Sequence, residues 1–173
     1  LGPLEGLSAL REVTIPAKHP WSDLRPCNGS GGLDGGLGAV SGLGRLEVLD
    51  LSHNALEGDI SAVENLTLLT DLALNENFIG GNISSVHNLS GLKFLGVGAA
   101  PSGKTVPESA QRERDLIEVY DLEDTFDDWQ PFPFLVGSLS EVSHLTNLTS
   151  LDVSRNNLSG DLSPLRDLTS MTY

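Results

Sequence analysis

The chain has 173 residues, the length of one domain, and a formal net charge of −14 from 24 acidic and 10 basic side chains. Such an acidic surface repels phosphate backbones, which proteins bind through Lys and Arg, so nucleic acid is excluded as a partner. A single cysteine excludes an internal disulfide, and no apolar run of 18 residues is present that could span a membrane.

The first predicted element is a strand over residues 10–15, in which Leu10, Val13 and Ile15 supply the apolar positions. Ahead of it, the spacing of Leu1, Leu4 and Leu7 fits the tail of a preceding turn of chain. The same strand pattern returns at Leu46, after 36 positions rather than the 23 that separate later strands. We therefore expect an insertion within residues 16–32.

The next strands are predicted at 46–51, 69–74 and 92–97, and their first leucines are 23 residues apart. Alternation places two large apolar side chains on one face of each strand, so each turn must stack on its neighbours to bury them. An asparagine follows several strands and is predicted to satisfy backbone groups of the turn, as a structural ladder of Asn54, Asn77 and Asn156.

Two further strands are predicted, at 117–122 and 148–153, with an insertion near 126–134 between them. The chain then stops at the start of another strand. The pattern therefore predicts one array over residues 1–173 with about six turns of 23 residues. Neither end shows a polar cap, so we expect a fragment of a longer array whose open ends contact neighbouring repeats or subunits.

The frame L-x-x-L-x-L-x-x-N-x-L at a period of about 20 to 29 residues is that of leucine-rich repeats, and the sequence resembles that family over nearly its whole length. The phrase Leu-x-Gly-x-Ile at 56–60 resembles the repeats of plant and protist receptor-like ectodomains. The resemblance implies an α/β solenoid, a right-handed horseshoe or superhelix with a parallel β-sheet on its concave face. It also implies a second short strand that follows the glycine.

The concave face is the first surface predicted to bind a protein partner, because strand residues between the apolar positions point to solvent there. The candidate residues on it are Asp50, His53, Asn75, Glu76, Asp121, Glu123, Asp124, Asp152 and Arg155. Between the acidic flanks we expect a shallow, bare floor at Ala73, Gly96, Gly98 and Ala99. An acidic face of this kind favours a basic partner, although it also fits a solvated sheet without a ligand.

Aromatic residues of the insertions form the second candidate surface, since aromatic side chains in loops are common at contacts. They are Trp21, Trp129, Phe132 and Phe134. The alternative is that these side chains fold back over an edge of the array.

No catalytic, metal or cofactor site is predicted. The segment 98–105 satisfies the phosphate-loop pattern G-x-x-x-x-G-K-[ST], but Pro107 falls where the following helix would propagate, so nucleotide binding is a remote alternative. The four histidines lack metal-ligand spacing, and the aspartates after 120 lack a calcium loop. We expect no enzyme but a non-catalytic protein–protein interaction module, or alternatively a structural scaffold subunit of a larger assembly.

Six sequons, Asn-x-Ser or Asn-x-Thr, exceed the number expected by chance, although the repeat itself accounts for part of them. Their asparagines are Asn28, Asn65, Asn82, Asn88, Asn147 and Asn157. They predict a glycoprotein that is secreted or at the cell surface; a cytoplasmic or organellar location is the alternative.

Overall fold

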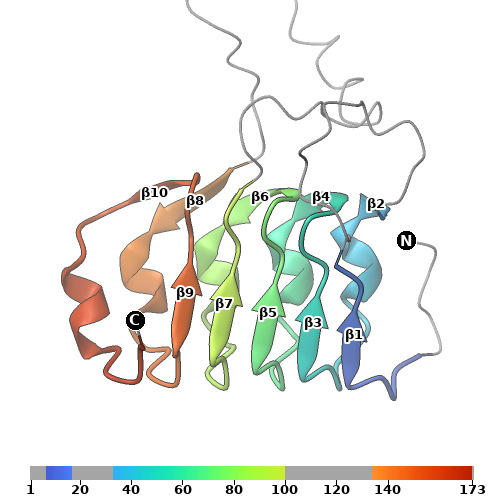
Figure 1. Ribbon diagram of the computed structural model, residues 1–173, viewed down its shortest axis with the longest axis horizontal. Coiled ribbons are helices and arrows are strands. Elements are labelled where there is room, and N and C mark those ends of the chain that lie inside the picture. The colour runs from blue at the N-terminus through green and yellow to red at the C-terminus, as the bar shows by residue number, and fades with distance from the viewer. Residues whose placement is uncertain (1–6, 17–32, 100–133, 173) are drawn as a thin grey trace, which may run out of the picture.

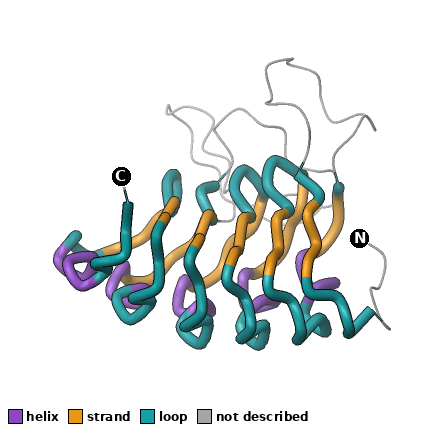
Figure 2. The backbone as a smooth tube through the Cα atoms, turned by 60° about the horizontal axis from the view of Figure 1, so that its bottom comes forward, coloured by secondary structure: helices purple, strands orange, loops and turns teal. Residues whose placement is uncertain are grey.

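The structure, a computed structural model, describes residues 7–16, 33–99 and 134–172. In these ranges the chain winds through stacked turns, each made of a strand, a corner, a second strand and a short 3₁₀ helix (Figures 1 and 2). Each regular turn returns after 23 residues, as Leu46, Leu69 and Leu92 show. The solenoid predicted from the repeat frame is confirmed.

Two all-parallel, five-stranded sheets run along the array. The first has the order β1-β3-β5-β7-β9, with strands Glu12–Thr14, Val48–Asp50, Asp71–Ala73, Phe94–Gly96 and Ser150–Asp152. The second has the order β10-β8-β6-β4-β2, with strands Asn157–Ser159, Leu135–Ser138, Phe78–Asn82, Ala55–Asp59 and Asp34–Gly36. The second short strand implied by the resemblance is therefore present, but it does not follow the glycine as expected: in β4, β6 and β8 the glycine lies within the strand.

The 3₁₀ helices follow the second strands and complete the wall opposite the first sheet (Figure 2). They are η1 (Leu37–Val40), η2 (Ile60–Val63), η3 (Ile83–Val86), η5 (Leu139–Val142) and η6 (Ser163–Asp167). In η2 and η3 the residue before the helix accepts a hydrogen bond from the backbone N–H two positions later: Asp59 from Ser61 and Asn82 from Ser84. These caps end the strand and begin the next element.

The core is a ribbon of leucine, isoleucine and valine between the two sheets and the helices. Each wall contributes one column of side chains that are fully buried in the middle turns, for example Leu49, Leu72 and Leu95 from the first sheet and Ile60 and Ile83 from the helices. No turn could bury these side chains alone, so the stacking of neighbours provides most of the stabilisation.

The predicted asparagine ladder is also present. Asn77 lies 2% exposed, donates from Nδ2 to the carbonyls of Leu51 (2.9 Å) and Leu74 (3.0 Å), and accepts from the Leu56 N–H at 3.0 Å. Asn54 and Asn156 repeat this arrangement in their own turns. Each amide therefore satisfies backbone groups of its own and the preceding turn, and the Leu51 carbonyl accepts from both Asn54 and Asn77.

The prediction of a sixth turn, which was based on the strand pattern at 117–122, is wrong. Strand β7 pairs directly with β9, and Leu95 lies opposite Leu151, so Leu122 does not stand between Val97 and Val153 in the ladder. The reason is that one turn, begun at Leu92, is completed by β8 and η5. Leu92 and Leu148 are 56 positions apart, so this turn carries 33 more residues than a regular one, and the insertion expected near 126–134 belongs to this longer segment.

Both ends of the described array expose apolar side chains. Leu7 and Ile15 are 46% and 47% exposed at one end, and Leu162 is 74% exposed at the other. A pocket of about 300 Å³ lies beside β1, lined mainly by Leu10, Val13, Ile15, Val40 and Leu51. Within the described ranges, no helix has the length and apolar character needed to cross a membrane.

Candidate partner-binding face

The solvent side of the first sheet carries three columns of side chains, which we call the open sheet face. The register of the strands sets the first two columns, which are Glu12, Val48, Asp71, Phe94 and Ser150, then Thr14, Asp50, Ala73, Gly96 and Asp152. The third column follows the strand ends and comprises Ser52, Asn75, Gly98 and Ser154. Polar and small residues dominate all three columns.

Nothing in the described part of the chain covers this face (Figures 1 and 2). An all-parallel sheet is normally covered on both faces, but here the core covers only one. The other face stays in solvent because alternation fills it with Asp, Ser, Asn and Gly rather than with leucine.

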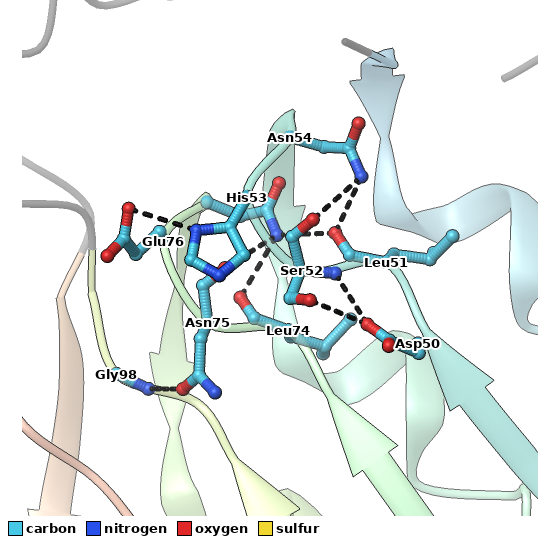
Figure 3. Close-up of polar contacts among 10 residues, drawn as sticks. Asp50, Leu51, Ser52, His53, Asn54, Leu74, Asn75, Glu76 and Gly98 are labelled. Carbon is cyan, nitrogen blue, oxygen red and sulfur yellow. Dashed lines mark hydrogen bonds and ion pairs between the residues drawn. The ribbon is translucent and has the colours of Figure 1, made fainter. Parts of the chain in front are cut away.

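Two carboxylates on the face are held by their own turns. Asp50 Oδ1 accepts hydrogen bonds from the Ser52 N–H at 3.0 Å and from the Ser52 hydroxyl at 2.6 Å (Figure 3). Asp152 Oδ1 accepts from the Ser154 N–H at 3.0 Å. The sequence Asp-x-Ser thus fixes the carboxylate in both turns, on β3 and on β9, before any partner arrives.

The centre of the face differs from the bare floor that the sequence predicts. Asn75 Oδ1 accepts from the Gly98 N–H at 2.7 Å, so its carboxamide lies across the glycines of the next turn (Figure 3). A Cβ on Gly96 would fall 2.4 Å from Asn75 Nδ2, and one on Gly98 would fall 2.7 Å from Ser154 Oγ. The glycines leave room for the amide, which fills the floor.

Three corner residues at the rim of the face have left-handed backbone conformations: His53, Glu76 and Arg155, with φ of 60°, 59° and 57°. Such residues are uncommon outside glycine, and the ladder asparagine that follows each one anchors the corner. His53 Nδ1 lies 3.2 Å from Glu76 Oε2 but makes no hydrogen bond, so the pair is an ion pair only when His53 is protonated.

The structure brings together six of the predicted contact residues, from β3, β5 and β9 and the corners after them: Asp50, His53, Asn75, Glu76, Asp152 and Arg155. Direct pairing of β7 with β9 removes the position in this face that Asp121, Glu123 and Asp124 were expected to occupy. These three residues, with Trp21, Trp129, Phe132 and most of the segment 98–105, lie outside the described residues. Phe134 is half-buried immediately before β8, away from the open sheet face.

Two residues that contribute to this face were not predicted from the sequence. Phe94 is half-buried in the first column, and its ring lies 2.9 Å from where a Cβ on Gly96 would be. Asp71 is half-buried in the same column and accepts from the Thr70 hydroxyl at 2.6 Å. Both could have been found from the second x of the L-x-x-L frame, which directly precedes a buried strand leucine and therefore points to the opposite face.

The described sequon asparagines are solvent-exposed, and none lies in the three columns of the open sheet face: Asn65, Asn82, Asn88, Asn147 and Asn157. Asn28 is outside the described residues. Among the residues that the structure describes, no cluster of His, Cys, Asp and Glu is arranged to hold a metal ion.

Comparison with known proteins gives the same architecture. The leucine-rich repeat family model matches residues 45–66 and 147–168. Among solved structures, the crystal structure of PEPR1–AtPEP1 is 22% identical with a TM-score of 0.56 and covers 81% of this chain and 16% of that chain. The leucine-rich repeat ectodomain of the receptor kinase SOBIR1 from Arabidopsis thaliana is 19% identical with a TM-score of 0.55, covering 84% and 62%.

These likenesses establish the fold. The chain spans less than two thirds of the length of either structure. No protein in the curated collection matches it significantly.

Proposed function

Because this chain is built of leucine-rich repeats, we propose that it is a non-catalytic protein–protein interaction module whose partner binds on the open sheet face. The observation that carries the proposal is an uncovered parallel sheet whose polar side chains are already fixed. Asp50, Asn75 and Asp152 each hold a hydrogen bond to backbone N–H groups. Fixed groups lose little conformational entropy when a partner binds, so their contacts contribute more fully to affinity.

A fold alone does not determine function, so the test addresses the face itself. The full-length protein is used to capture partners from its source organism, with Ala73→Arg as the perturbing variant. Ala73 is half-buried in the middle column, and a long cation there obstructs the centre of the face. Ser61→Arg is the matched control, because it adds the same side chain at an exposed position on η2.

We expect Ala73→Arg to lose the captured protein and Ser61→Arg to retain it, with circular dichroism and thermal unfolding confirming that both variants are folded. Retention by both variants would overturn the proposal.

We further propose that the protein is extracellular and glycosylated. The support is the exposure of five sequon asparagines and their position outside the open sheet face, where sugars would leave the face accessible. The two similar structures are an ectodomain of a receptor kinase and a PEPR1 complex. Mass spectrometry of the native protein tests this: hexose on Asn65 or Asn88 is expected, and unmodified asparagine at all six sequons would contradict it.

A second candidate function, that of a scaffold subunit, is favoured by the apolar surface at the final turn. Leu162 is 74% exposed, and Leu158 and Leu165 beside it are only half-buried. Such a surface suits a neighbouring subunit or repeat. Light scattering of the full-length protein and of Leu162→Glu tests the idea, since a scaffold contact at this end predicts that the variant has the lower mass.

A further inference from the structure

We propose that the open sheet face binds an extended, basic segment of its partner, in which two basic side chains four residues apart contact Asp50 and Asp152. This inference rests on the proposed function and specifies the chemistry of the partner. It follows from the charge of the face, from the distance between the two carboxylates and from the donor group between them.

Acidic side chains outnumber basic ones on this face. Its columns hold four acidic residues on four different strands, Glu12, Asp50, Asp71 and Asp152, and no Lys or Arg. The bases next to these strands in sequence are Arg11, which pairs with Glu47, Lys93 before β7 and Arg155 after β9. Among the described residues, no base lies within ion-pair distance of Asp50 or Asp152. A partner that covered these carboxylates without a cation would have to desolvate two uncompensated charges, so complementarity requires a base opposite each.

The strand order sets the spacing of those bases. Asp50 on β3 and Asp152 on β9 share one column and are separated by three strand intervals, through β5 and β7. Neighbouring strands are about 4.8 Å apart, which makes roughly 14 Å in all. An extended chain advances about 3.3 Å per residue and directs every second side chain to the same side, so residues i and i+4 span the distance.

The centre of the face determines which kind of residue the partner can place between its two basic side chains. Side chain i+2 would lie over Ala73 and Gly96, where the Asn75 amide already fills the floor, so this residue must be small. Asn75 Nδ2 has no hydrogen-bond partner among the described residues and is a donor held in place by the Gly98 N–H. It suits a main-chain carbonyl of the partner. An extended segment offers such carbonyls, whereas a helix uses its own internally.

Synthetic peptides test the spacing directly. The probe is a fluorescein-labelled Thr-Arg-Thr-Gly-Thr-Arg-Thr, and the control is Thr-Arg-Thr-Gly-Arg-Thr-Thr, which has the same composition and charge but places its arginines three residues apart. Binding to the full-length protein is measured by fluorescence anisotropy at low salt. We expect the first peptide to bind about fivefold more tightly, as one well-placed surface ion pair allows.

Protein variants then locate the contact. Asp50→Asn with Asp152→Asn should weaken the first peptide by roughly 10- to 25-fold and abolish the preference between the two peptides. The matched control, Glu64→Gln with Asp167→Asn, removes the same charge at exposed positions away from the face and should change affinity less than twofold. Equal affinity for both peptides, equal loss in both double variants, or no binding of either peptide would each overturn the inference.

Failure here is distinguishable from failure of the proposed function. If Ala73→Arg still abolishes capture of a partner while the peptides show no preference, the interaction module stands and the extended basic segment does not. If Ala73→Arg leaves capture unchanged, the module itself is wrong.

Discussion

The middle turns of the array and its final turn carry the same repeat frame but bury it to different depths. Leu72 and Leu95 are fully buried, whereas their equivalent Leu151 is half-buried. The contrast is larger further along the turn, where Ile60 and Ile83 are fully buried and the equivalent Leu162 is 74% exposed. Burial is therefore a property of the neighbouring turns on both sides, and the frame alone does not provide it.

Hydrogen bonding follows the same division. Asn77 in the middle and Asn156 in the final turn have equivalent donors and acceptors, yet Asn77 is 2% exposed and Asn156 is half-buried. Identical bonds should therefore contribute differently to stability, because water competes for them only in the final turn.

The largest expected difference is in the core. We expect Leu72→Ala to lower the free energy of unfolding by about 3 to 4 kcal/mol and Leu151→Ala by about half as much, because the first leaves a closed cavity. Urea denaturation followed by circular dichroism measures both. Leu68→Ala, at a residue 53% exposed, is the control and should change little. Equal losses at 72 and 151 would show that the final turn is covered as well as the middle ones.

The ladder asparagines should show a smaller difference in stability loss between the middle and the final turn. Asn77→Ala leaves the Leu56 N–H and the Leu74 carbonyl without their side-chain partner, which costs about 2 to 3 kcal/mol in a buried place. Asn156→Ala should cost about 1 kcal/mol, since water can replace the amide. Asn88→Ala in bacterially produced protein is the exposed control. Hydrogen exchange of the Leu56 amide provides a second measurement, and unchanged protection there would contradict the role assigned to Asn77.

Glycines of the second sheet give the next contrast. Gly81 and Gly160 both have positive φ, 105° and 101°, so alanine strains both by about 1 kcal/mol or more. A Cβ on Gly81 would also fall 2.5 Å from Asp59 Oδ2, whereas on Gly160 its nearest neighbour is 3.5 Å away. Gly81→Ala should therefore destabilise about twice as much as Gly160→Ala in thermal unfolding. Gly42→Ala, which meets nothing within 4 Å, should be close to neutral.

The smallest expected effect concerns pH and is confined to the final turn. Hydrogen bonds from the Ser163 hydroxyl and N–H lower the pKa of Asp161 below its ordinary value of 3.8. A lowered pKa means that folding favours the carboxylate, so its contribution is fully present above about pH 4 and is lost as the pH falls through the folded-state pKa. NMR titration of Asp161 should show this, and Ser163→Ala should return the pKa towards 3.8. An unchanged titration curve in Ser163→Ala would refute the assignment.

Most of the fold was predictable from the sequence because each turn repeats the same local pattern. Strands, ladder asparagines and core columns follow from alternation and a constant period. The place predicted for 117–122 in the ladder was wrong, because β7 pairs directly with β9 and alternation over six residues does not by itself specify which strands pair. The position of the ladder asparagine after that segment is occupied by Thr125, which was a signal against a turn there.

The position of the open sheet face could be predicted from the sequence, but the way its side chains fill the centre could not. Asp50 and Asp152 follow from the repeat columns, whereas the place of Asn75 depends on contact between two turns 23 residues apart. The sequence does contain one indication of this contact. Gly96 and Gly98 alternate in the turn that follows Asn75, and they leave the space that its amide occupies.

The direct pairing of β7 with β9 has a consequence for how this molecule can change over time. Ala99 and Phe134 both hold regular places in the stack, so deleting 101–133 would restore a 23-residue interval and put position 100 where a ladder asparagine belongs. The corner therefore accommodates 33 additional residues while β7 and β9 pair in the same register as the other strands of the sheet. Evolution, or a protein engineer, can therefore replace the inserted segment without changing the stacked turns on either side of it.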